Sequence, residues 1–172
     1  GWAKVSIGTS PSHNITVHEY AYQSIPDVPL LAGDANTTVA SPAQNVILSD
    51  NGPYGEAADI QISFNMASIE ATISDYRVIL VKSTKAASFD LDSAKAMPLS
   101  SMKRIAKTGS NITAQLDNNV VDSDGDIIAP NVAYKAFVLS APDATNATEG
   151  ILSTVSNELT LDINVASRAR NI

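Results

Sequence analysis

Four aspartates lie within ten residues of one another: Asp117, Asp122, Asp124 and Asp126. Calcium takes about six to eight oxygen ligands, and closely spaced aspartates on one loop can supply them. The spacing is not that of an EF-hand, because Gly125 comes too early and Ala133 stands where the closing glutamate would be. We therefore predict calcium at Asp122, Asp124 and Asp126. The alternative is a solvated acidic loop with an aspartate–glycine turn.

Exposed aromatic rings are a second kind of candidate site, since their faces can stack on sugars. Tyr54 lies in a loop between Gly52 and Gly55, and Trp2 begins a strand-like stretch. We predict glycan contacts at both, with packing inside a hairpin as the alternative for Trp2.

No pattern in the chain points to catalysis. The absence of cysteine excludes disulfides, thiolate nucleophiles and thiolate zinc sites. There is no Gly-x-Ser-x-Gly elbow, phosphate-binding glycine loop or paired histidine–carboxylate motif. We expect a protein that is not an enzyme.

The net charge of -7 and the isoelectric point near 4.6 argue against nucleic-acid binding, which requires a basic face. No apolar run approaches the roughly 18 residues that span a membrane. We predict neither a nucleic-acid partner nor membrane insertion.

The elements that must position these residues read as strands. Ile60, Ile62 and Phe64 alternate with polar residues, whereas 76–81 is apolar on both faces, as in a central strand. A second central strand is predicted at 134–139, and a short helical turn is expected before Pro98. Strands at this spacing, without long helices between them, indicate an antiparallel, seven-stranded β-sandwich. Its predicted core comprises Phe64, Tyr76, Val78, Leu116, Tyr134 and Val138.

Turn-forming residues divide the chain into four predicted parts. These are a β-hairpin or the end of a preceding β-module at 1–33, a linker at 34–45, the sandwich at 46–163 and a tail at 164–172. An isolated hairpin is barely stable in water, so we expect the first part to pack on something, in cis or in trans.

Residues 44–163 resemble the fibronectin type III-like repeats of Bacteroidetes surface proteins. The resemblance rests on the segments 59–64, 73–83, 122–126, 131–140, 152–153 and 156–161. It implies an all-β immunoglobulin or fibronectin type III-like sandwich, here with an extra N-terminal β-hairpin. Two features depart from the pattern: Phe64 replaces the usual tryptophan of the second strand, and the loop from Leu116 to Tyr134 is longer than usual.

The resemblance adds two site predictions. In such a sandwich the loop after the first strand and the aspartate-bearing loop share one pole, so Asp50, with Asn51 and Asp59, is expected to join the calcium site. The tripeptide centred on Ser93 resembles a Bacteroidetes O-glycosylation motif, which would place a glycan on its hydroxyl.

The resemblance implies a non-catalytic structural or adhesion module, extracellular or at the cell surface, that is one repeat of a longer protein. Because the chain begins at Gly1, we expect a processed or partial chain. Its expected partners are neighbouring domains or subunits of a surface assembly, and glycans. The alternatives are a carbohydrate-binding accessory module of a secreted polysaccharide-degrading enzyme and a filament subunit joined by strand addition.

Overall fold

The computed structural model describes residues 2–7, 15–21 and 38–163. The chain divides into two units, Gly1–Thr37 and Thr38–Ile172. In the first, β1 (Trp2–Ile7) pairs antiparallel with β2 (Ile15–Ala21). The expected tail and the first residues of the expected linker lie outside the described residues.

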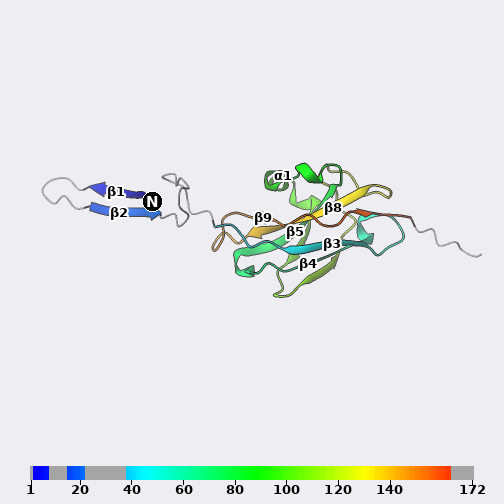
Figure 1. Ribbon diagram of the computed structural model, residues 1–172, viewed down its shortest axis with the longest axis horizontal. Coiled ribbons are helices and arrows are strands. Elements are labelled where there is room, and N and C mark those ends of the chain that lie inside the picture. Colours follow the sequence, from blue (N-terminus) through cyan, green and yellow to red (C-terminus); the bar gives the residue numbers. More distant parts are fainter. Residues whose placement is uncertain (1, 8–14, 22–37, 164–172) are drawn as a thin grey trace, which may run out of the picture. The chain divides into compact units, whose positions relative to one another are not determined.

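The described part of the second unit consists of strands with little helix (Figure 1). Its strands are β3 (Gln44–Asp50), β4 (Ile60–Asn65), β5 (Ile73–Lys82), β6 (Lys103–Ala106), β7 (Ile112–Gln115), β8 (Ala133–Pro142), β9 (Ile151–Leu152) and β10 (Leu159–Thr160). The one α-helix of this part is α1 (Leu91–Ala96). No described helix has the length and apolar character needed to cross a membrane.

These strands form two antiparallel sheets, so the all-β prediction is confirmed. One sheet has the order β3-β4-β7, and the other has the order β10-β8-β5-β6, with β9 also paired to β8. Because β5 occupies one edge of β8, β9 and β10 must share the other edge. The eight strands therefore occupy seven strand positions, three in the smaller sheet and four in the larger.

One hydrophobic core draws residues from both sheets, because every second side chain of a strand points to the same face. The six residues predicted for the core are all buried: Phe64, Tyr76, Val78, Leu116, Tyr134 and Val138. The rings of Phe64 and Tyr76 meet edge to face, 5.1 Å apart, and join the two sheets. The Tyr76 hydroxyl accepts a hydrogen bond from the Ala67 N–H and donates one to Glu70, so this buried polar group is satisfied.

A second cluster covers the outer face of the larger sheet. Residues 83–102, which include α1, lie over the outward-facing Ile79 and Val81 of β5 and Phe137 of β8. Phe89 packs its ring against that of Phe137 at 5.2 Å. The middle of β5 and of β8 is consequently buried on both faces, which explains the continuous apolar runs in their sequences.

Residues 38–43, placed in a linker by the sequence prediction, pack onto the second unit. The Ala40 N–H donates to the Glu149 carbonyl at 2.7 Å, and the Ser41 hydroxyl is hydrogen-bonded to that of Ser68. Ala43 is buried in the core. The chain therefore joins this unit at Thr38, several residues before its first strand.

Truncating Phe64 to alanine should lower the free energy of unfolding by about 3–5 kcal/mol, because it removes a buried ring from the contact between the sheets. Chemical denaturation monitored by circular dichroism measures this loss. The control is Ile127→Ala, at a residue that is 79% exposed, and it should change stability by less than about 0.5 kcal/mol. A Phe64→Ala loss as small as the control's would show that the ring does not hold the sheets together.

Candidate functional site

The aspartates lie on the loop of residues 116–132, which connects β7 to β8. Asp122 organises a tight turn: its Oδ1 accepts hydrogen bonds from the N–H groups of Asp124 at 2.9 Å and Asp126 at 3.0 Å. The Asp122 N–H in turn donates to the Asp126 carbonyl at 2.9 Å. Gly125 adopts a φ of 85°, a left-handed conformation that suits glycine, so the aspartate–glycine turn predicted from the sequence is present.

The turn is attached to the larger sheet just beyond Lys103, the first residue of β6. β6 pairs with β5 only as far as Val78, and beyond that point the Ser123 N–H donates to the Leu80 carbonyl at 2.9 Å. Asp122 thereby takes the next position along the edge of β5 and is completely buried. This attachment brings the aspartates to the end of β5.

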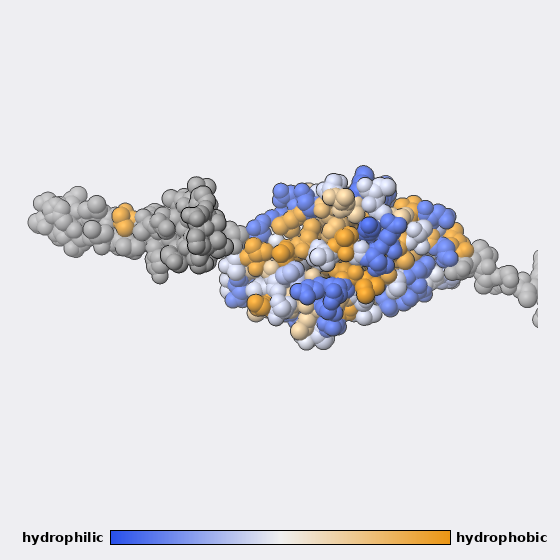
Figure 2. Space-filling model, viewed as in Figure 1, coloured by the Kyte–Doolittle hydropathy of each residue, from blue (hydrophilic) through white to orange (hydrophobic). Residues whose placement is uncertain are grey.

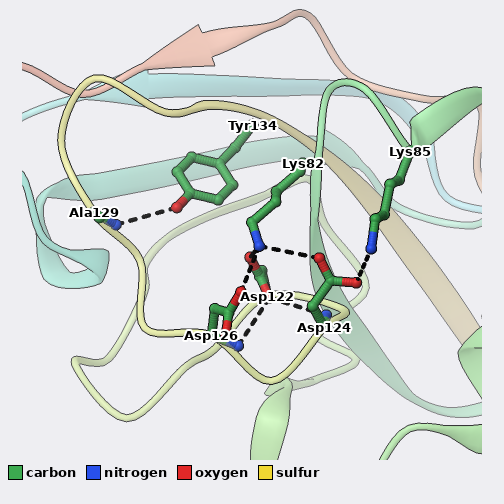
Figure 3. Close-up of polar contacts among 7 residues, drawn as sticks. All are labelled: Lys82, Lys85, Asp122, Asp124, Asp126, Ala129 and Tyr134. Carbon is green, nitrogen blue, oxygen red and sulfur yellow. Dashed lines mark hydrogen bonds and ion pairs between the residues drawn. The ribbon is translucent and has the colours of Figure 1, made fainter.

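The last residue of β5, Lys82, lies at the centre of the three aspartates (Figure 3). Its ammonium nitrogen is 3.2 Å from Asp122 Oδ2, 3.0 Å from Asp124 Oδ2 and 2.5 Å from Asp126 Oδ2. Lys85 reaches Asp124 Oδ1 from the following turn at 2.6 Å. We call these five residues the aspartate–lysine cluster.

The electrostatics of the cluster follow from these contacts. Hydrogen bonds from Lys85 and Lys82 hold the pKa of the Asp124 carboxyl below its usual value. The bonds to Asp126 and Asp124 raise the pKa of Lys82, so its ammonium stays charged. Asp122 Oδ2 accepts no hydrogen bond of good geometry, and its described partner is the Lys82 ammonium. Two lysine charges thus offset two of the three aspartate charges.

Three carboxylate oxygens, one from each aspartate, lie within 4.8 Å of one another, a spacing that could hold a metal ion. In the structure the Lys82 ammonium contacts the same three carboxylates. A metal ion at this position would therefore have to displace the lysine side chain.

The other acidic candidates are engaged elsewhere. Asp117 accepts a hydrogen bond from Lys103 at 2.7 Å. Asp50, expected at the calcium site, is not part of the three-aspartate group, and its Oδ1 accepts from the Gly52 N–H at 3.2 Å. The buried Asp59 organises the same loop through the N–H groups of Tyr54 and Glu56.

The predicted glycosylation and glycan-contact residues are separate from the cluster. The Ser93 hydroxyl donates to Asp90 Oδ1 at 2.6 Å, at the start of α1, where Asp90 caps the helix. Tyr54 is 71% exposed. Trp2 belongs to β1, and its side chain lies outside the described residues.

The sequence prediction did not include Lys82 and Lys85 in the site, although each carries a direct ion pair to Asp124. One signal was available, since Lys82 ends an otherwise apolar central strand. Its partners stand about 40 residues further along, and only the attachment of the loop to β5 brings them together.

No family model matches the chain, and no curated protein sequence matches it significantly.

Proposed function

We propose that residues 38–163 form a non-catalytic structural module of the fibronectin type III kind, which serves as one link in an extracellular or cell-surface assembly. The observation that carries the proposal is that Thr38 and Ile163, the first and last described residues of this unit, lie at its opposite ends. Units connected in this way can be joined in series, as in proteins built from tandem β-modules.

The positions of the two ends follow from their contacts. At the entry, the Thr38 carbonyl accepts from the Thr148 N–H at 2.9 Å, next to the loops that follow β4 and β8. At the exit, Ile163 lies against Gly55 in the loop before β4. Because β4 spans the unit from Ile60 to Asn65, the two ends are separated by the length of a strand (Figure 1).

Two features support the fibronectin type III assignment. The sheet orders β3-β4-β7 and β10-β8-β5-β6 put the first, second and fifth strand positions in one sheet and the remaining four in the other. The hydroxyl of Tyr134, near the start of β8, also bonds back to the Ala129 N–H at 3.1 Å (Figure 3). A tyrosine in this position that bonds to the backbone a few residues upstream is typical of immunoglobulin-like sandwiches.

Glycan contact through Tyr54 stays a prediction that rests on the exposure of its ring.

Hydrophobic residues on the visible face of the unit are interspersed with hydrophilic ones (Figure 2). This surface favours a module that acts through its connections to neighbours.

The aspartate–lysine cluster fits the structural role, because its lysines fasten the long loop to the end of β5. Calcium is the second candidate for this cluster, favoured by the closeness of the three carboxylates. The two hypotheses differ in what occupies the centre of the carboxylates, an ammonium group or a metal ion.

Because Lys82 contacts all three carboxylates, we expect about 1 mM calcium to leave the melting temperature of the native protein unchanged. Lys82→Met frees the carboxylates, and calcium should then raise the melting temperature of this variant by about 2–8 °C, reversibly with chelator. The matched control is Lys95→Met, which removes a lysine paired with Glu149 outside the cluster and should create no response to calcium. A chelator-reversible rise in the native protein, lost in Asp124→Asn, would instead establish a calcium site.

We expect a single domain of this size to unfold under load as one unit. Single-molecule extension of the full chain, held at its two ends, pulls residues 38–163 through Thr38 and Ile163. We predict one cooperative step with a contour-length gain of about 400 Å, which is the length of 126 residues at about 3.3–3.6 Å each less the folded separation of the two ends. Phe64→Ala should lower the force of this step without changing its length. Extension without a discrete step, or in several small ones, would contradict the proposal.

A further inference from the structure

β4 is flanked by β3 and β7, and its hydrogen bonds to them determine which backbone groups of these two strands point away from the sheet. The Leu116 N–H donates to the Ile60 carbonyl, so these two residues form a hydrogen-bonded pair across β4 and the end of β7. Hydrogen-bonded pairs recur at every second residue of an antiparallel ladder. The next hydrogen-bonded pair is therefore Ile62 with Ala114, which lie opposite each other in the register of the two strands, so the backbone groups of Ala114 point toward β4. The N–H and C=O groups of Thr113 and Gln115 point away from the sheet.

The same rule applied to β3, on the other side of β4, is verified by a side chain. The Asn51 N–H donates to the Asp59 carbonyl, so the groups of Leu48 should point outward. The Asn157 side chain occupies both of them: its Oδ1 accepts from the Leu48 N–H at 2.8 Å, and its Nδ2 donates to the Leu48 carbonyl at 3.0 Å. The β3 edge is thus closed by an amide that mimics a neighbouring strand.

The β7 edge has no such closure among the described residues. No described group is hydrogen-bonded to the outward N–H and C=O of Thr113 or Gln115. β7 also lacks the charges that commonly protect an edge strand, whereas the β6 edge carries Lys103 and Arg104. Of the β3, β6 and β7 edges, β7 is therefore the one best suited to accept another strand.

We propose that β7 pairs antiparallel with β7 of a second copy of this chain, about a twofold axis at Ala114. Thr113 of each copy then lies opposite Gln115 of the other, and the two small sheets merge into one of six strands. The inference goes beyond the proposed structural role and stands on the β7 edge alone.

The second copy is the occupant favoured by the strand's own pattern. Thr113 and Gln115, whose backbone groups point outward, lie symmetrically on either side of Ala114. A twofold rotation at Ala114 therefore places each of them opposite the other in the second copy, as an isologous interface requires. Four backbone hydrogen bonds can form, and the uncharged strand meets its copy without like-charge repulsion. The interface is short, because β7 has four residues, so association should be weak and concentration-dependent.

Sedimentation velocity of the full chain from about 10 μM to about 1 mM tests the proposal. The native protein should shift from monomer toward dimer across this range. Thr113→Pro should abolish the shift, because it removes an outward N–H and leaves the bonds between β4 and β7 intact. Thr113→Val, which keeps the N–H, is the matched control and should dimerise like the native protein. Both variants should retain the native melting transition.

Cross-linking tests the register and does not depend on the proline variant folding. The chain contains no cysteine. Opposed residues of a hydrogen-bonded antiparallel pair are about 5.5 Å apart at Cα, within disulfide range. A mixture of Thr113→Cys chains with Gln115→Cys chains should therefore form a disulfide-linked dimer under mild oxidation, at a yield at least about tenfold above either variant alone.

Three results would overturn the proposal. These are a monomer at every concentration, a dimer that persists unchanged in a folded Thr113→Pro variant, and a dimer in which the cysteine mixture cross-links no better than its components. The last two outcomes would assign the contact to another surface, such as β6 or the β1–β2 hairpin.

Discussion

The described part of the second unit depends on the pairing of β5 with β8, the longest ladder between its strands. Both strands are buried on two faces, by the smaller sheet on the inside and by residues 83–102 on the outside. Apolar burial stabilises by roughly 25 cal/mol per Å², so two strands shielded on both faces concentrate the hydrophobic stabilisation of the fold. The other strands add to this ladder or face it.

Several other features supply hydrogen-bond partners to backbone groups at the edges of β8, β3 and β5. Ser153 and Ser156 accept hydrogen bonds from the backbone of β8 where β9 and β10 leave a gap between them. Asn157 closes β3, and the loop held by the aspartate–lysine cluster extends the edge of β5 beyond β6. Among the edges of β3, β5 and β7, that of β7 has no such partner in the described residues, and it carries the inferred contact with a second copy.

The sequence predicted those features that depend on local periodicity. The alternation beginning at Ile60 identified β4, and the two-faced apolar run identified β5, because burial imposes these patterns directly. Particular contacts between residues far apart in the sequence were not predicted. Lys82 meets its aspartates only through a loop attached to β5, Asn157 closes an edge that is remote in sequence, and residues 83–102 gave no sign of covering a sheet. Asp50 was assigned to the calcium site because its loop and the aspartate-bearing loop were expected at the same end of the sandwich. Closeness of two loops does not determine which of their side chains meet.

Hydrogen exchange of individual amides tests most directly whether the β5–β8 ladder holds this unit together. Ala136 and Val138 donate their N–H groups to serine hydroxyls on the far side of β8, so Phe137 and Leu139 must donate toward β5. The account predicts that these two amides exchange only through global unfolding, with a free energy equal to that from denaturant titration. Exchange at a clearly lower free energy, while amides of the smaller sheet stay protected, would contradict it.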